Sequence, residues 1–286
     1  MSKYRIRVFS SFCDSSVCKE VYERLCESGC VDNYGKDKEI YFTNEDDYTH
    51  VIIMNTAMPN LKPISKENVI GMAIEPPQYL GLTNSFIHYA EKFIGKYFIG
   101  ETFGLSKPFI EYYSFMWHNP LLKHIPIKNK MMSIMVSQKL TAPGHQYRHT
   151  LVKRILESKL PIDIYGKGCT FYKNDIRIKG EFSELEPYVD YQFHIAIENF
   201  SLNHYFSEKI TNTLHAGTTP IYLGCKNIHN YFPNMVITLS HDIDKDMQLL
   251  TDIISNPEKH RTSINVDTVK NKTNLLLNIK NIFPNK

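Results

Sequence analysis

Apolar and polar residues alternate along the first half of the chain in two different patterns. Short apolar runs of strand length are separated by two longer segments in which apolar residues recur every three to four positions, as in an amphipathic helix. Strands that alternate with helices indicate a parallel sheet of the α/β class. The predicted strands span residues 4–9, 39–42, 50–54, 69–74, 92–99 and 109–117, and the predicted helices span residues 15–27 and 84–91.

The same alternation begins again after residues 118–126, which contain two prolines and show no periodicity. We expect that segment to connect two consecutive α/β domains, residues 1–122 and 127–265. Residues 266–286, around Leu275-Leu276-Leu277, predict a C-terminal helix or tail that packs back on the body. In the second domain the predicted strands span residues 131–137, 161–165, 193–197, 219–223 and 235–239, and the predicted helices span 145–158 and 206–216.

Composition limits the classes of protein to which the chain can belong. Its 286 residues are 42% hydrophobic and 22% charged, which excludes disorder and leaves room for two domains with a cleft between them. The formal net charge of +3 is too small for a surface that coats a nucleic acid, so we expect any anion site to be local. The chain shows no signal peptide and no apolar stretch of membrane-spanning length, and we expect a soluble, cytoplasmic protein.

Four of the six cysteines lie in the first 30 residues, at Cys13, Cys18, Cys26 and Cys30. The C-x-x-C pair that is typical of a zinc site is missing, and the last three of these cysteines share one face of a predicted helix. The spacing favours reduced, partly buried thiols, and a metal site or a disulfide is the less favoured alternative.

The residues best suited to chemistry follow the predicted strand 193–197. Glu198 and Asn199 end this strand, and Ser207, Glu208 and Lys209 begin the next helix. Ligands of open α/β sheets bind beyond the carboxyl ends of the strands, and a helix N-terminus attracts anions. Lys209 therefore suits a phosphate and Glu208 suits ribose hydroxyls, although acidic residues also begin ordinary helices.

Three consecutive pieces of sequence in this region form a longer motif of about 30 residues. They are Ile197-Glu198-Asn199, Tyr205-Phe206-Ser207-Glu208-Lys209 and the Ala-Gly-Thr-Thr-Pro-Ile-Tyr-Leu-Gly run of residues 216–224. The arrangement resembles the donor-binding signature of the family 10 glycosyltransferases, the α1,3/α1,4-fucosyltransferases. Ile197 replaces the usual Phe of that signature, and Ser207 replaces the commoner Thr.

The resemblance implies a GT-B-type fold of two Rossmann-like α/β domains with a cleft between them. Residues 1–122 would then face the acceptor, and residues 127–265 would bind the nucleotide sugar. The family places a phosphate-neutralising arginine after the first strand of the second domain, where Arg148 lies; a solvated helix cation is the alternative. The family also carries a Glu-Ser-Pro-like motif after a strand of the first domain, where this chain has Glu75-Pro76-Pro77, so Glu75 is the implied general base and a simple turn carboxylate is the alternative.

The implied reaction is inverting transfer of L-fucose from GDP-fucose to a hydroxyl of a glycan acceptor. Glu75 would accept the proton, while Arg148 and Lys209 would neutralise the diphosphate that leaves. The family implies neither a prosthetic group nor a metal ligand, so we expect the D-x-D sequence at Asp242 and Asp244 to lie in a solvated loop. The implied donor-binding residues are Glu198 at the sugar pocket, Asn199, Tyr205 and Glu208 at ribose and phosphate, Ser207, and His204 as a loop contact.

Two alternatives keep the fold. The same site could use another nucleotide sugar, because nothing in the motif reads guanine or fucose directly, or the chain could be a non-catalytic glycan-binding derivative. Retention of Glu75, Arg148, Glu208 and Lys209 together argues against the second alternative. A nucleic-acid partner is disfavoured by the modest charge. The resemblance is to a compact, soluble member of the family, since the first predicted strand begins at once.

Overall fold

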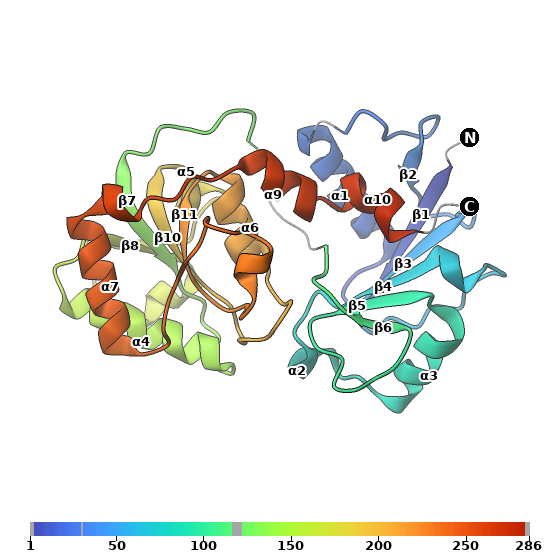
Figure 1. Cartoon of the computed structure of the whole chain (residues 1–286), viewed down its shortest axis with the longest axis horizontal. Coiled ribbons are helices and arrows are strands. Elements are labelled where there is room, and N and C mark those ends of the chain that lie inside the picture. The colour runs from blue at the N-terminus through green and yellow to red at the C-terminus, as the bar shows by residue number, and fades with distance from the viewer. Residues whose placement is uncertain (1–2, 30, 116–121, 284–286) are drawn as a thin grey trace. The chain divides into compact units, whose positions relative to one another are not determined.

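The computed structural model describes residues 3–29, 31–115 and 122–283 (Figure 1). It divides the chain into two compact units. The first unit contains Met1–Leu121 together with Asn271–Lys286, and the second contains Leu122–Lys270. Each unit is built on a six-stranded sheet in which neighbouring strands run parallel. Of the predicted connection, residues 118–121 lie outside the described residues.

The sheet of the first unit has a fully buried strand in its interior. All five residues of β3 (His50–Met54) are buried, as expected for a strand of a parallel sheet that is covered on both faces. Helix α1 (Ser15–Gly29) follows the first strand, and α2 (Pro77–Leu80) and α3 (Asn84–Phe93) follow the fourth. The strand order is β2 (Ile40–Phe42), β1 (Tyr4–Ser10), β3, β4 (Val69–Met72), β5 (Lys96–Ile99) and β6 (Phe109–Glu111).

Four predicted strands of this unit are shorter in the structure, and β2 differs by only one residue, since it begins at Ile40 instead of residue 39. Strand β5 begins at Lys96 instead of residue 92, because α3 continues to Phe93 with Phe86 and Ala90 on its buried face. The short apolar run before Gly95 fits a helix and a strand equally well by periodicity, which explains the wrong boundary. Strand β4 ends at Met72 and β6 at Glu111, and residues 116–117 of the predicted strand lie outside the described residues.

The sheet of the second unit reverses its order at its centre. From β7 (Lys130–Met135) the chain continues to β8 (Ile162–Tyr165) and β9 (Ile178–Gly180) on one side. It then returns to the other side of β7 with β10 (Tyr191–Ile197), β11 (Thr219–Leu223) and β12 (Ile237–Thr238). Such a switch point is where parallel α/β sheets open a crevice for ligands.

Helices cover the sheet of the second unit, as Figure 1 shows. Helices α4 (Pro143–Glu157) and α7 (Ile243–Ser255) contribute buried apolar residues to one core cluster with β7, β8 and β10. Helix α6 (Glu208–His215) contacts β10 and β11. The helices α5 (Glu186–Val189) and α8 (Pro257–His260), together with α7 and β9, were not predicted.

The expected charged loop at Asp242-Ile243-Asp244 is instead the beginning of α7. The Asp242 carboxylate accepts hydrogen bonds from the backbone N–H of Asp244 at 3.2 Å and of Lys245 at 3.3 Å. Aspartate is a preferred residue immediately before a helix because it accepts from otherwise unpaired N–H groups. The D-x-D sequence is therefore a helix cap in this chain.

The C-terminal segment consists of two helices where the sequence predicts one. Helix α9 (Val266–Thr273) ends before Asn274, whose side chain caps α10 (Leu275–Ile282) by accepting from the Leu276 N–H at 2.9 Å. The Lys280 ammonium lies 2.9 Å from the Glu39 carboxylate, within the first unit.

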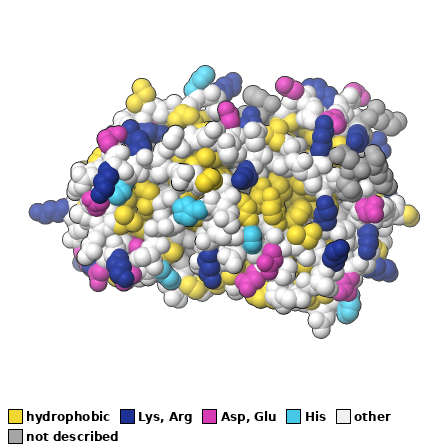
Figure 2. All heavy atoms as spheres, viewed as in Figure 1, with side chains coloured by type: hydrophobic (Ala, Val, Ile, Leu, Met, Phe, Trp, Pro, Cys, Tyr) yellow, Lys and Arg dark blue, Asp and Glu magenta, His cyan; other side chains and the backbone are white. Residues whose placement is uncertain are grey.

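The surface of the described residues carries mixed charges. On the face shown in Figure 2, Lys and Arg side chains are interspersed with Asp and Glu, and no basic stripe crosses it. In the part of the chain that the structure describes, no helix combines the length and apolar character needed to cross a membrane.

Candidate functional site

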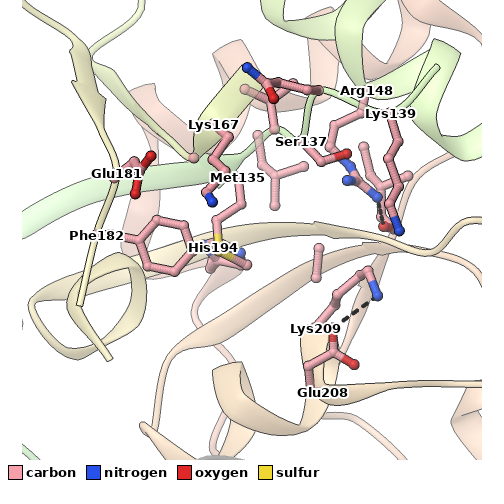
Figure 3. Close-up of a pocket in the computed structure, with 16 residues that line it drawn as sticks. Met135, Ser137, Lys139, Arg148, Lys167, Glu181, Phe182, His194, Glu208 and Lys209 are labelled. Carbon is pink, nitrogen blue, oxygen red and sulfur yellow. Dashed lines mark hydrogen bonds and ion pairs between the residues drawn. The ribbon is translucent and has the colours of Figure 1, made fainter. Parts of the chain in front are cut away.

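A cavity of about 450 Å³ opens in the second unit at the point where the strand order reverses (Figure 3). Its wall is built from the ends of β7 and β10, the first turn of α6, one side of α4 and the loops that follow β7, β8 and β9. Arg148, Glu208 and Lys209 are the predicted donor residues that line it. The further lining residues with polar or aromatic side chains are Ser137, Gln138, Lys139, Lys167, Glu181, Phe182 and His194.

The first turn of α6 is fixed by a buried carboxylate. Glu198, only 2% exposed, accepts a hydrogen bond from the backbone N–H of Ser207 at 2.8 Å and another from its hydroxyl at 2.6 Å. The ammonium of Lys209 lies 3.4 Å from the same carboxylate. Because Ser207 also precedes the first helical residue as the cap, one network sets both the helix start and the position of Lys209.

Lys209 and Glu208 form a charged pair at the cavity wall, with the Lys209 ammonium 3.0 Å from the Glu208 carboxylate. Burial acts to lower the pKa of Lys209, but the charges of Glu208 and Glu198 outweigh it and raise that pKa. Burial acts to raise the pKa of Glu208, and the charge of Lys209 and its hydrogen bond outweigh it and lower that pKa. Both groups are therefore ionised at neutral pH.

Arg148 supplies a second cation from α4. Its side chain is only 6% exposed, and one guanidinium nitrogen donates to the carbonyl of Ile197 at 2.5 Å. Burial lowers the pKa of Arg148, while the charges of Glu198 and Glu208 act in the opposite direction. Among the described residues, Arg148 forms no ion pair within 4 Å, so its remaining donors are available to an anion in the cavity.

His194 contributes a neutral imidazole to the cavity wall. Its Nδ1 lies 2.8 Å from the Ser133 hydroxyl, which in turn donates to the carbonyl of Pro187 at 2.5 Å. Burial lowers the pKa of His194 to about 3, which keeps the ring uncharged at neutral pH. The cations of the cavity are therefore lysines and arginine alone among its described lining residues.

The cavity has two chemically different ends. In Figure 3 the nitrogen atoms of Lys139, Arg148 and Lys209 lie on one side, and Glu181 and Phe182 lie on the other. Three cations close together suit an anion with several oxygens, such as a diphosphate. Two of them, Arg148 and Lys209, were predicted from the sequence, whereas Lys139 was missed. Its position in the loop after the first strand of the second domain, four residues beyond the end of β7, could have indicated it.

The remaining predicted donor residues do not line this cavity. Glu198 and Asn199 line a separate, smaller cavity of about 40 Å³, and Ser207 and Tyr205 are buried. His204 is held by its backbone N–H, which donates to Asn227 at 2.8 Å, and by a hydrogen bond between its ring and the Tyr231 hydroxyl. None of these five residues is among those that line the large cavity.

Glu75 belongs to the first unit, three residues beyond the end of β4. The side-chain oxygen of Asn55 accepts hydrogen bonds from the backbone N–H groups of Ile74 at 3.0 Å and of Glu75 at 3.2 Å. Asn55 is itself 2% exposed, and its backbone carbonyl accepts a hydrogen bond from the Tyr97 hydroxyl at 2.8 Å. The backbone that carries Glu75 is thus fixed to the carboxyl end of β3, while its side chain is half-buried.

The cysteines described by the structure are free thiols. Cys13 and Cys18 have their sulfur atoms 3.5 Å apart, and burial raises the pKa of Cys18 to about 12. Cys30 lies outside the described residues, and the side chain of Cys26 is not described. Within the described ranges, no group of three or more His, Cys, Asp or Glu side chains is placed to hold a metal ion.

Comparisons with known proteins match both the fold and the motif. Residues 125–259 match the family model described as "Glycosyltransferase family 10 (fucosyltransferase) C-term". Protein R654 of Acanthamoeba polyphaga mimivirus, which carries the name of a fucosyltransferase, is 28% identical over 204 residues, or 60% of this chain. This chain spans only 32% of the length of that relative.

Solved structures with the same architecture include a crystal structure of an α1,3-fucosyltransferase with GDP, with a TM-score of 0.52 and 11% identity. It covers 94% of this chain and 81% of that one. The TarM protein of S. aureus aligns with a TM-score of 0.54 and 10% identity, over 82% of this chain and 55% of that one. At these identities the likeness establishes the fold alone.

The fold is that of the GT-B glycosyltransferases, as predicted, with two parallel α/β sheets. The match of residues 125–259 to the C-terminal model of glycosyltransferase family 10 confirms the resemblance found in the motif around Glu208 and Lys209.

Proposed function

We propose that this chain is an inverting fucosyltransferase, which transfers L-fucose from GDP-fucose to a hydroxyl of a glycan acceptor. The observation that carries the proposal is the convergence of Arg148 and Lys209 on one cavity, at the switch point of a family 10 domain. A solved α1,3-fucosyltransferase of the same fold was crystallised with GDP, which supports GDP as the nucleotide.

The second unit would bind the donor through its diphosphate. Arg148 would donate in a forked geometry to phosphate oxygens, and the Lys209 ammonium would approach them from the first turn of α6, where the helix dipole adds favourable potential. As the bond from the sugar to the phosphate breaks, negative charge grows on the departing GDP. Cations that are already fixed in place stabilise that charge without reorganising.

The other predicted donor residues would act around this clamp. Glu208, whose side chain is 47% exposed, retains room to accept hydrogen bonds from ribose hydroxyls. Asn199 and Tyr205 would hold ribose and phosphate, and His204 would contact the donor from the loop. Glu198 and Ser207 would act by holding Lys209 in place, since both hydrogen-bond within its network.

Glu75 of the first unit would act as the general base. Its carboxylate would take the proton of the acceptor hydroxyl while the hydroxyl oxygen bonds to the anomeric carbon, and the sugar–phosphate bond breaks on the opposite face with GDP leaving. The bonds made and broken are those of a single displacement, which inverts the anomeric configuration. The residues given these roles would carry the reaction with no prosthetic group.

The test is a transfer assay with GDP-fucose and a panel of glycan acceptors, read by mass spectrometry and by the anomeric coupling in NMR. We expect transfer by the wild-type chain and a loss of about 100-fold or more in Glu75→Gln, because a general base contributes roughly 10²–10⁴ in rate. The affinity for GDP should stay unchanged in that variant. Glu91→Gln, on an exposed face of α3, is the matched control.

Full transfer by Glu75→Gln would remove Glu75 as the base. Transfer from another nucleotide sugar, with GDP-fucose inert, would remove the proposed donor. Binding of glycans without any transfer would identify the chain as a non-catalytic derivative. Transfer that persists at full rate in the presence of EDTA is the further expected result.

A further inference from the structure

One end of the cavity has no part in the proposed diphosphate clamp. Lys167, Glu181 and Phe182 line it there, opposite Arg148 and Lys209 in Figure 3. All three come from the loops that follow β8 and β9, a region whose strand β9 the sequence did not predict.

A backbone hydrogen bond joins the chain segments where the two loops begin. The backbone N–H of Gly166 donates to the carbonyl of Gly180 at 2.6 Å, directly after the parallel pairing of β8 with β9. Both glycines have positive φ, 106° and 79°, a conformation that residues with a side chain rarely adopt. Because Lys167 and Glu181 follow these glycines immediately, the backbone brings an ammonium and a carboxylate to the same part of the cavity wall.

Phe182 adds an aromatic surface beside the carboxylate. Its side chain is 38% exposed, and its ring meets the buried ring of Tyr165 edge-on, with centroids 6.1 Å apart at 84°. The contact supports one edge of the ring and leaves area for a flat ligand. An aromatic ring next to hydrogen-bonding groups is the usual arrangement for holding a nucleobase.

We propose that this end of the cavity reads guanine, with the Glu181 carboxylate accepting from the base N1–H and the 2-amino group and with Phe182 stacking on the ring. Lys167 then lies on the side of the base that carries the O6 acceptor. The inference rests on the proposed function, because the diphosphate must occupy the other end.

The chemistry selects guanine over the other common bases. Guanine presents two adjacent N–H donors, which match the two oxygens of a carboxylate. Adenine presents an acceptor nitrogen at the corresponding ring position, and uracil presents one N–H between two carbonyl oxygens. Each of these would place an acceptor against the Glu181 carboxylate, which is unfavourable.

The experiment measures dissociation constants of GDP, IDP, ADP and UDP by calorimetry for the wild-type chain and for Glu181→Gln. IDP differs from GDP only by the missing 2-amino group. A hydrogen bond to a charged group corresponds to about a tenfold change or more in affinity, so the wild type should prefer GDP to IDP by about that factor. Glu181→Gln should lower the GDP-to-IDP ratio, because a neutral amide oxygen accepts from the 2-amino group more weakly than a carboxylate does.

Two further variants complete the design. Glu184→Gln makes the same charge change three residues away, at an exposed site that does not line the cavity, and should keep the wild-type ratio. Phe182→Ala should weaken GDP and IDP by similar factors, about tenfold, and leave their ratio unchanged, because stacking does not read the 2-amino group.

The outcomes separate this inference from the proposed function. The proposed recognition of guanine is wrong if the wild-type chain binds GDP no better than IDP, or if Glu181→Gln keeps the wild-type ratio. Either result leaves the proposed binding of the diphosphate by Arg148 and Lys209 unaffected. Preference for UDP overturns the reading of guanine as well. A wild-type chain that binds none of the four nucleotides defeats the proposed function, and this inference fails with it.

Discussion

Replacement of Arg148 should affect ligand binding and protein stability in different ways. Its guanidinium is almost fully buried and donates to the Ile197 carbonyl, yet among the described residues it forms no ion pair within 4 Å. A buried charge without a close partner is expensive to desolvate. Arg148→Met removes that charge and retains most of the side-chain length and apolar contact.

The two consequences have opposite signs. Relief of the desolvation penalty should leave the free energy of unfolding of Arg148→Met unchanged or raise it. Loss of a charge-assisted hydrogen bond to the diphosphate should weaken GDP by about 1.5–3 kcal/mol, which is roughly 10–100-fold in the dissociation constant. A residue that was present only for packing would show neither effect.

Calorimetry with GDP and urea unfolding measure both quantities on the same protein. Arg154→Met is the matched control, because Arg154 lies on the same helix, is partly exposed and pairs with Asp244 at 2.9 Å, away from the cavity. We expect the control to bind GDP like the wild type. A folded Arg148→Met protein whose affinity for GDP lies within twofold of the wild type would refute the reasoning.

Three further predictions concern stability. Ser207→Ala should lower the free energy of unfolding in urea by about 2–3 kcal/mol, because it removes a helix cap and one partner of the buried Glu198 carboxylate; a change below about 0.5 kcal/mol would contradict this. Gly144→Ala should destabilise the chain by about 3 kcal/mol, since its Cβ would lie 1.8 Å from the carbonyl oxygen of Glu198, and a normal melting temperature would be the contrary result. Burial lowers the pKa of Lys128 to about 8, below its unfolded value of about 10.4. Between these two pH values the unfolded chain binds more protons than the folded chain, so the free energy of unfolding rises with pH. The wild type should therefore gain stability relative to Lys128→Met as the pH rises through this window, and a constant difference would exclude the effect.

The sequence correctly predicted the elements whose local pattern of apolar and polar residues fits only one type of secondary structure. Strands β3 and β11 have the predicted bounds, because each is a mostly apolar run bounded by polar residues or glycine. The start of α6 was predicted within two residues, since the Ser-x-Lys segment after a loop carries a capping signal. The family motif then predicted three of the residues that line the cavity.

Features that depend on contacts between residues far apart in the sequence were not predicted. Strand β9 has three residues and no buried position, so no periodicity marks it. Glu181 and Phe182 reach the cavity only because β9 pairs with β8, a contact that composition and spacing do not encode. Likewise, Ser207 donates hydrogen bonds to Glu198, although eight residues of loop separate them in the sequence. The sequence predicted that both residues lie near the donor, but it did not predict the hydrogen bonds between them.

The most direct test of the account is a crystal structure of the chain with GDP. We expect the diphosphate in the cavity of the second unit, with its oxygens within hydrogen-bond distance of the Arg148 guanidinium and the Lys209 ammonium, and the guanine against Phe182. GDP bound at another place on the chain, or bound in this cavity with its phosphates away from both cations, would contradict it.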